Sequence, residues 1–392
     1  MFLNLPPTRI FSEPWTLESR ESRLVNACRG KTRVAYYYDF PDGSTFRYRV
    51  HNMIRVLATF DPDVSVTWFC REDMPHLGNI VASLDVLIIC RARYTASLNE
   101  MISRARHAGC AVIYDVDDLV FDQDFVHLLA RTLGLDFDAD SVCDFWFGYV
   151  GRIGAAMRLC DRTITTNDYL AERIRKWSGG EVRVVPNFLN EEQLDFSREI
   201  IDAKRASNYA RDGTILLGYF SGTPSHNRDF ALIEPALIRI MTGDRRLRLR
   251  VGGYLSLGPA FAPLADRIEQ LPMQNHVNLQ RFIGETEFNL SPLQNNVFTN
   301  CKSELKFFEA GIVGTNTIAS PIFSFRQAIV EGVNGRLSRA QEWDDKLLAA
   351  IADLDGSGEA YRVMAERAFA TCEVAYSWRH QRDVIRASLF SP

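Results

Sequence analysis

The stretch Asn300-Cys301-Lys302-Ser303-Glu304-Leu305-Lys306-Phe307-Phe308-Glu309-Ala310-Gly311 carries the pattern from which the fold is best predicted. Lys302, Lys306 and Glu309 recur at positions i, i+4 and i+7, so they share one face if the stretch is a helix. Lysines near a helix N-terminus favour a bound phosphate, and a carboxylate two turns later suits sugar hydroxyls. A solvated charged helix face explains the same spacing equally well.

The residues around this pattern predict where the helix begins and ends. Asn300 and Ser303 are residue types that cap helix N-termini, and Gly311 is typical of a helix end. A short β-rich run, 315–320, follows. A helix followed directly by a strand is the expected unit of an α/β fold.

The composition is that of a globular protein with two domains. The 392 residues exceed the roughly 250–300 at which a single core stops growing. The net charge of −4 gives no overall attraction to nucleic acid, so no nucleic-acid partner is expected. No apolar run reaches the roughly 18 residues of a membrane span. Eight cysteines occur without a CxxC pair or a Cys/His cluster, as is typical of buried thiols in a reducing compartment.

Apolar runs separated by helix-length segments predict parallel sheets, because buried parallel strands lack in-out alternation. The expected strands of the first half are 34–40, 64–70, 86–90, 111–116, 162–166 and 182–185. Those of the second half are 215–220, 247–251, 277–283, 288–293, 317–320 and 336–337, with 260–271 expected to be helical. Two doubly wound α/β domains follow, with a ligand cleft at the carboxyl ends of their strands.

The alternation of predicted strands and helices also gives the domain limits. We expect an N-terminal extension over 1–32, a first domain over 33–192, a second over 193–375 and a terminal helix within 376–392. Acidic and aromatic residues within 122–160 interrupt the first series. A packed helix, an acceptor groove and a docking surface all remain open for that insert.

Several motifs resemble one known family. Ser221-Gly222-Thr223 after a strand, Gly252-Gly253 after the next and the 302–309 stretch resemble the C-terminal domain of GT-B glycosyltransferases. The closest group is glycosyltransferase family 4, the "group 1" transferases of bacterial surface polysaccharide assembly. Tyr48-Arg49-Val50, Tyr114-Asp115-Val116-Asp117-Asp118-Leu119 and 185–188 resemble motifs of a bacterial subset, and the resemblance covers roughly residues 33–390.

The resemblance implies two Rossmann-like domains facing across a cleft, with the helix 378–389 packing back on the first. It implies transfer of a sugar from a nucleotide-diphosphate donor to a hydroxyl of a glycan, lipid-linked or protein acceptor, with retention. No cofactor and no metal are expected. The opening residues, 1–7, lack signal-peptide features, so we expect a cytoplasmic protein, with peripheral contact at the inner membrane face if the acceptor is lipid-linked.

The family also implies a donor site in the second domain. Glu309 matches the glutamate that holds the ribose, whereas its usual partner falls at Cys301, so the pair is incomplete. The loop 221–228 lacks the family's Arg/Lys pair for the pyrophosphate, and other basic residues must replace it. The donor-binding candidates are Ser221, Gly222, Thr223, His226, Arg228, Asn300, Lys302, Ser303, Lys306 and Glu309. An ordinary βα turn or surface positions remain the alternatives.

Candidates from the first domain follow its strand ends. Asp117 and Asp118 would face the cleft as catalytic residues together with Lys306, although metal binding by the Asp115-x-Asp117-Asp118 group or simple capping also fits. The acceptor-side candidates are Gly43, Ser44, Arg47 and Arg49. The two arginines suit a phosphate, while turn chemistry alone explains Gly43 and Ser44.

Two other functions fit the same residues. The incomplete glutamate pair and the missing Arg/Lys pair are compatible with a non-catalytic binding or partner subunit of the same fold. A nucleotide-sugar epimerase or hydrolase is the other alternative.

Overall fold

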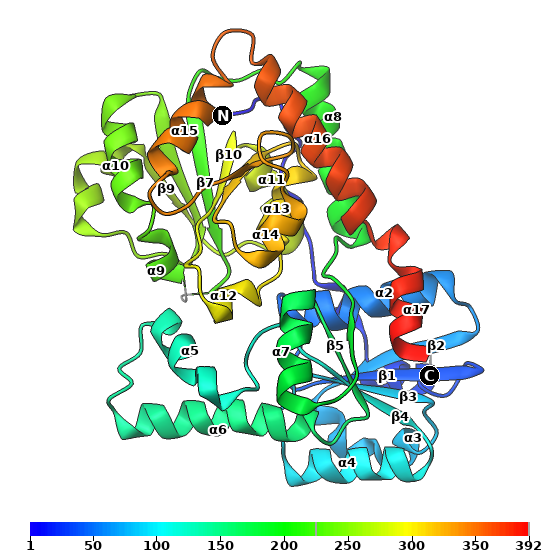
Figure 1. Cartoon of the computed structure of the whole chain (residues 1–392). Coiled ribbons are helices and arrows are strands. Elements are labelled where there is room, and N and C mark those ends of the chain that lie inside the picture. The colour runs from blue at the N-terminus through cyan, green and yellow to red at the C-terminus, as the bar shows by residue number, and fades with distance from the viewer. Residues whose placement is uncertain (224–225, 391–392) are drawn as a thin grey trace.

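The computed structural model describes residues 1–223 and 226–390, and in this part of the chain twelve strands form two parallel sheets of six. Each sheet is the centre of one domain, and the two domains lie one above the other (Figure 1). The expected α/β architecture with two doubly wound domains is therefore confirmed.

The first sheet has the strand order β2-β1-β3-β4-β5-β6. Its strands are β1 (Thr32–Tyr38), β2 (Val64–Phe69), β3 (Val86–Cys90), β4 (Ala111–Asp115), β5 (Arg162–Thr165) and β6 (Val182–Val184). The helices of this half are α1 (Arg20–Asn26), α2 (Asn52–Phe60), α3 (Gly78–Val81), α4 (Ala96–His107), α5 (Val126–Leu133), α6 (Asp140–Met157) and α7 (Asp168–Ser178). All six strands match the sequence prediction, because each apolar run is buried under helices.

The second sheet has the order β12-β11-β10-β7-β8-β9. Its strands are β7 (Ile215–Ser221), β8 (Leu247–Gly253), β9 (Ile268–Leu271), β10 (Phe288–Ser291), β11 (Asn316–Ala319) and β12 (Arg336–Leu337). Its helices are α9 (Asn227–Phe230), α10 (Glu234–Gly243), α11 (His276–Gly284), α12 (Val297–Asn300), α13 (Leu305–Gly311), α14 (Phe323–Ala328) and α15 (Trp343–Ala352).

The secondary structure of two segments in the second half was predicted wrongly. The expected strand 277–283 is helix α11, which the Asn275 side chain caps by accepting from the Asn278 backbone N–H. The expected helix 260–271 is a 3-10 turn followed by strand β9. β9 lies at the sheet edge and its central residues are exposed, so it lacks the apolar run of a buried strand.

The predicted helix around Lys302 is also shorter than expected. Helix α12 ends at Asn300, a turn holds 301–304, and α13 begins at Leu305 with Glu304 as its N-cap. Asn300 and Ser303 are therefore not the caps of this helix.

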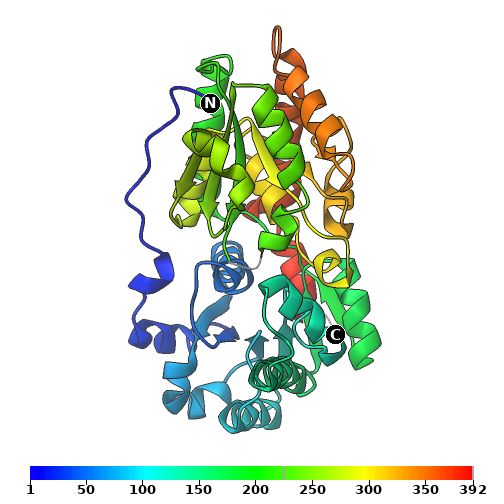
Figure 2. The ribbon, with the colours of Figure 1, turned by 90° about the vertical axis from the view of Figure 1, so that its left-hand side faces the viewer.

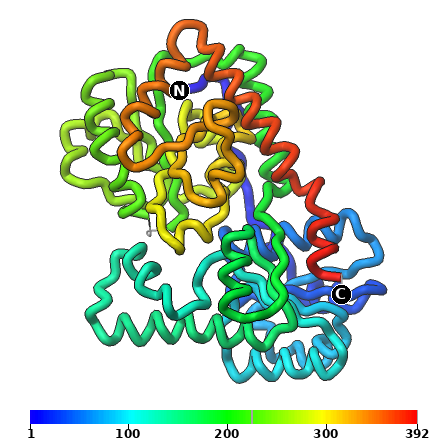
Figure 3. The backbone as a smooth tube through the Cα atoms, viewed as in Figure 1, coloured from blue at the N-terminus to red at the C-terminus, as the bar shows by residue number. Residues whose placement is uncertain are grey.

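The chain passes between the domains near both ends as well as in the middle. The segment after β6 leads into α8 (Glu191–Ala206), and α16 (Glu359–Tyr376) leads to α17 (Arg382–Phe390) on the first domain (Figures 1 and 3). Helix α17 packs on α2, and Arg382 and Arg386 each lie 2.7 Å from Asp61. The terminal helix thus packs back on the first domain.

The N-terminal segment forms another connection. It runs down one side of the molecule from the second domain to the first (Figure 2). Phe2 is buried against Tyr209 and Tyr361 in the second domain, whereas Trp15 is buried against Phe46 in the first.

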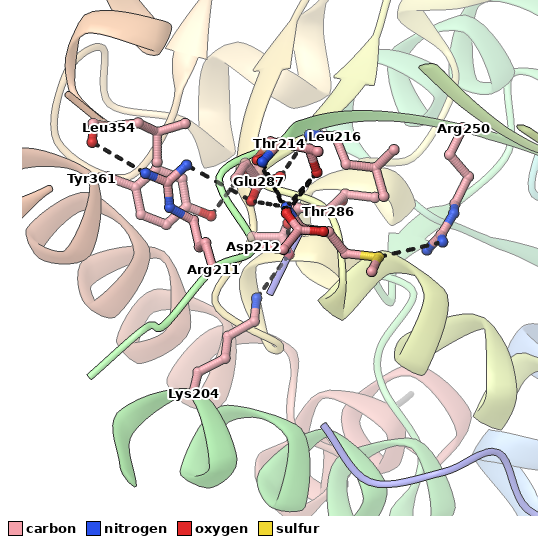
Figure 4. A network of polar contacts seen from close by, with 12 residues as sticks. Lys204, Arg211, Asp212, Thr214, Leu216, Arg250, Thr286, Glu287, Leu354 and Tyr361 are labelled. Atoms are coloured by element: carbon pink, nitrogen blue, oxygen red, sulfur yellow. Dashed lines mark hydrogen bonds and ion pairs between the residues drawn. The ribbon is translucent and has the colours of Figure 1, made fainter. Parts of the chain in front are cut away.

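The amino group of Met1 lies in a polar network of the second domain that includes Asp212 and Glu287, both labelled in Figure 4. It contacts buried Glu287 at 2.7 Å and Asp212 at 2.9 Å. Lys204 donates to the carbonyl of Gly314 nearby, and burial lowers its pKa well below the usual range. The segment over 1–32 is therefore packed along both domains.

Candidate functional site

A cavity of about 800 Å³ lies between the two domains. Its walls come from the loops after β1, β3 and β4 of the first sheet and after β7, β8 and β9 of the second, and helices α5, α6 and α13 complete them. The loops lie at the carboxyl ends of parallel strands, where doubly wound folds bind ligands.

Most of the predicted site residues line this cavity. From the first domain these are Gly43, Ser44, Arg47, Asp117 and Asp118. From the second they are Ser221, Gly222, Thr223, His226, Lys302, Lys306 and Glu309.

Glu309 lies on α13 and faces the first domain. Its Oε1 accepts a hydrogen bond from the Tyr48 hydroxyl at 2.6 Å and lies 3.8 Å from the Arg47 guanidinium. The backbone carbonyl of Glu309 accepts from Gln280 of α11, which holds the helix in place. Burial raises the pKa of Glu309, and the Arg47 charge opposes that rise.

Lys306 points its amino group toward the ring of Tyr219, 4.5 Å from the ring centre. This buried Nζ has no hydrogen-bond partner among the described residues. Burial lowers the pKa of Lys306 to about 8, while Asp229 and Glu309 favour its charged form. A buried cation without a partner is costly, so it is suited to an anionic ligand.

His226 lies at the same wall. Its Nδ1 is 2.9 Å from Asp229 Oδ2, and Asp229 also accepts from the Gln294 backbone N–H. Burial lowers the pKa of His226 to about 4 despite the Asp229 contact, and the charges of Lys306 and Lys302 lower it further. His226 is therefore neutral at pH 7.

The loop after β8 approaches the loop after β7 closely. Gly253 has a φ of 84°, and a Cβ there would meet the carbonyl oxygen of Ser221 at 2.2 Å. Ser221 Oγ donates to the carbonyl of Thr223. The glycine lets two strand ends meet at the cavity without a side chain between them.

On the opposite wall, Arg91 links the acidic residues after β4. Its NH1 lies 2.9 Å from Asp117 and 3.5 Å from Asp118, and it donates to Thr45. Asp117 also accepts from the Thr45 hydroxyl. Although burial favours the neutral carboxyl, the Arg91 charge and the Thr45 hydrogen bond hold the pKa of Asp117 below its usual range.

Asp118 also faces Lys302 across the cleft, with Nζ 3.8 Å from Oδ1. Asp115, the first member of the predicted acidic group, pairs with Arg49 instead. The described residues contain no group of three or more His, Cys, Asp and Glu that could hold a metal ion. Each of these carboxylates is instead paired with a cation.

Four predicted residues lie outside the cavity lining in the described part of the chain. The guanidinium of Arg49 is fully buried and binds both oxygens of Asp115 as well as the carbonyl of Val185. The Arg49 guanidinium therefore stabilises the first domain and does not reach a ligand in the cavity.

The other three belong to the second domain. Asn300 donates to Asn295 and Asn296 and accepts from the backbone N–H of Phe323, so its amide joins α12 to α14. Ser303 sits in the turn before α13, and Arg228 is exposed on α9.

Cys301, at the position where the resemblance places the first glutamate of the pair, is fully buried. Its carbonyl accepts from Asn167 at the start of α7, which docks the turn onto the first domain. Burial raises the pKa of the Cys301 thiol. Lys302, the next residue, reaches the cavity in its place.

Sequence reasoning missed several lining residues. Arg91 directly follows the apolar strand β3. The same position, just after a buried strand, is what singled out Asp117, so the sequence signal for Arg91 was present. Tyr48 lies in a motif noted for the family, but its contact with Glu309 spans 261 positions. Glu13 and His276, which lie 3.2 Å apart in the cavity wall, meet only because of the path of the N-terminal segment, and the sequence carries no signal for it.

No protein-family model matches the sequence, and no curated protein matches it. Solved structures are similar over nearly the whole chain. HepE of Anabaena in complex with UDP has a TM-score of 0.62 at 12% identity, covering 91% of this chain and 98% of that one. WaaG, a glycosyltransferase involved in lipopolysaccharide biosynthesis, has a TM-score of 0.59 at 12% identity, covering 92% and 100%.

A sucrose-phosphate synthase from Thermosynechococcus elongatus has a TM-score of 0.58 at 14% identity, covering 91% and 96%. These proteins share the GT-B arrangement of two Rossmann-like domains. The expected GT-B fold is therefore confirmed.

Proposed function

We propose that this protein is a glycosyltransferase that moves a sugar from a nucleoside-diphosphate donor to an acceptor hydroxyl. The observation that carries the proposal is the unpartnered amino group of Lys306 beside Glu309 in the cavity between the domains. A diphosphate supplies the missing anion, and a carboxylate at this distance along α13 accepts from ribose hydroxyls. The similar HepE structures include complexes with UDP, with UDP and glucose, and with UDP-glucose.

In the proposed reaction, Lys306 and Lys302 neutralise the charge that develops on the departing diphosphate. Electrostatic stabilisation of this kind in a site shielded from water lowers the barrier more than it would in solution. Neutral His226 donates from Nδ1 to Asp229, so its Nε2 is an acceptor and becomes a donor to the diphosphate only when the bound anion has favoured protonation of the ring. Arg47 approaches from the first domain with a buried NH1 that has no hydrogen-bond partner among the described residues.

We further propose that the acceptor, a glycan, a lipid-linked sugar or a protein, enters along the first domain. Asp117 and Asp118 line that wall, where Arg91 fixes their direction. Retention at the transferred sugar, independence of metal and a cytoplasmic location are parts of the same proposal. None of the helices that the structure describes is long and apolar enough to cross a membrane.

The proposal is tested by melting curves with UDP, GDP, dTDP, CDP and CMP, with and without Mg²⁺. A ligand that binds only the folded state raises the melting temperature. We expect a rise with at least one nucleoside diphosphate, unaffected by Mg²⁺, and a smaller rise in Glu309→Gln. Glu366→Gln is the matched control, because Glu366 also accepts from a tyrosine but lies outside the cavity.

Two results would redirect the proposal. No shift with any nucleotide favours a non-catalytic subunit of the same fold. A shift that requires Mg²⁺ favours a metal held by the acidic residues after β4. Product analysis of the matching nucleotide sugar with and without acceptor then separates transfer from epimerisation and hydrolysis.

A further inference from the structure

One hydrogen bond ties the proposed ribose-binding residue to the opposite domain. The Tyr48 hydroxyl donates to Glu309 Oε1 at 2.6 Å, and the two residues are 4% and 8% exposed. Hydrogen bonds to a buried charge are among the strongest in proteins. The position of this carboxylate is therefore set by a residue of the first domain as well as by its own helix.

The backbone aims Tyr48 at the cleft. Residues Arg47–His51 form a single π-helical turn before α2, and all five are buried. Such turns are frequent at functional sites. Here Arg47 and Tyr48 face Glu309, whereas Arg49 faces Asp115.

Contacts on both sides hold the tyrosine ring. The Arg47 guanidinium lies 4.0 Å from its ring centre, and Phe308 of α13 packs edge-on at 6.2 Å. Because Phe308 precedes Glu309 on the same helix, the ring and the hydroxyl both contact α13. Movement of the second domain away from the first would break these contacts together.

We propose that Tyr48 is a positioning residue for donor binding, which fixes the Glu309 carboxylate so that the ribose binds when the two domains stand together. The inference rests on the proposed function. An ionised carboxylate has about four acceptor sites, and Tyr48 occupies one of them. Arg47 lies near the same oxygen, and because Glu309 lines the cavity, its other acceptor sites are available to a ligand there. Tyr48 itself does not touch the reacting atoms.

The charges around Glu309 give this role a measurable signature. Arg47 and Tyr48 face the carboxylate from the first domain and Lys306 from its own helix. Burial raises the pKa of Glu309, and all three of these groups oppose the rise. Loss of the Tyr48 hydroxyl removes one of them, so Glu309 becomes protonated at a higher pH and loses an acceptor for the ribose.

The test is Tyr48→Phe, which removes only the hydroxyl. UDP, GDP and CDP are each compared with the 2′-deoxy form by titration calorimetry between pH 5 and pH 8. In the wild type the ribo form should bind more tightly. In the variant this preference should fall roughly five- to tenfold, and the loss of affinity at low pH should begin at a higher pH.

Tyr209→Phe is the matched control, because it removes a tyrosine–glutamate hydrogen bond of 2.8 Å to Glu366 outside the cavity. It should leave the preference and the pH profile unchanged. Glu309→Gln should lose the preference with Tyr48 intact.

The outcomes separate this inference from the proposed function. If no nucleoside diphosphate binds the wild type, the donor function is overturned and this inference with it. If the wild type binds and Glu309→Gln loses the preference, but Tyr48→Phe keeps both the preference and the pH profile, the positioning role is overturned and the donor function stands. If Tyr48→Phe changes only the melting temperature, the positioning role is likewise overturned and the donor function stands.

Discussion

At and beneath the first-domain wall of the cavity, basic residues other than Arg47 are bound by carboxylates, whereas the second-domain wall carries a lysine whose amino group has no such partner in the described part of the chain. In the first domain, Arg49 binds Asp115 and Arg91 binds Asp117, Asp118 and Thr45. In the second domain, the amino group of Lys306 is buried over Tyr219 and has no hydrogen-bond partner among the described residues.

This difference separates structural cations from candidate ligand-binding ones. A buried arginine whose donors are satisfied by protein carboxylates has little left for a ligand. A buried lysine without a partner retains its desolvation cost, which an anion relieves. Residue type and spacing do not make this distinction, since Arg47 and Arg49 stand two positions apart and fall on opposite sides of it.

The largest expected effect comes from breaking a satisfied pair. Arg49→Met should reduce the free energy of unfolding by about 3–5 kcal/mol, because it leaves the Asp115 charge buried without its partner. Urea unfolding at pH 8 measures the loss. Burial raises the pKa of Asp115 to about 6 even with Arg49 present, so the pair is charged in the wild type at pH 8. Loss of Arg49 raises that pKa further, and at pH 8 the variant must keep an unpaired buried charge or take up a proton, both of which cost stability.

A double variant sharpens this prediction. Arg49→Met with Asp115→Leu removes both charges and should recover much of the stability. A double variant as unstable as Arg49→Met alone would show that packing around Arg49, and not the charge pair, is responsible.

Replacing Lys306, the cation without a partner among the described residues, should weaken ligand binding without reducing the stability of the free protein. Lys306→Met should leave the unliganded protein at least as stable, because it removes a buried charge without a hydrogen bond. Affinity for the nucleoside diphosphate should fall by about 1.5–3 kcal/mol, or roughly 10- to 150-fold. Calorimetric titration measures the affinity, and Lys176→Met, at an exposed side chain of α7, is the control. A large drop in stability with unchanged affinity would show that Lys306 supports the fold and does not bind the diphosphate.

The titration of Lys306 gives a further test. Burial lowers its pKa to about 8 in the free protein, and a bound diphosphate favours the charged form and raises that pKa. Affinity should therefore be full below pH 8 and fall above it, by up to about tenfold per pH unit until the pKa of the complex is passed. Titrations from pH 6 to 10 measure this fall, which should be absent in Lys306→Met.

The smallest effect is expected for the pair that crosses the cleft. Lys302 and Asp118 lie 3.8 Å apart and are both partly exposed. Asp118→Asn should change the free energy of unfolding by at most about 1 kcal/mol, and less at high salt. Melting temperatures at low and high ionic strength check this, with Glu172→Gln in the exposed pair with Lys176 as control. A change of several kcal/mol in both Asp118→Asn and Lys302→Met would mean that this pair holds the domains together, whereas a large change in Asp118→Asn alone would point to its contact with Arg91.

The sequence predicted the sheets better than the helix ends. Buried parallel strands such as β3 appear as uninterrupted apolar runs, a signal that needs no knowledge of neighbours. Edge strand β9 lacks that signal, and α11 shows apolar residues at Val277, Leu279 and Ile283, which fit a strand as well as a helix. Packing of α11 on α8 settles the choice, and it is a tertiary contact.

For the site, the sequence alone determined the chemical types and their local place, because those follow from short-range pattern. Asp117 was placed after a strand, and Lys306 and Glu309 were placed on one face of a helix. Which cations remain without a partner, and that Tyr48 meets Glu309, was decided only by the tertiary structure. The reason is physical: hydrogen bonding and desolvation depend on groups that lie far apart in the chain and meet only when the two domains pack together.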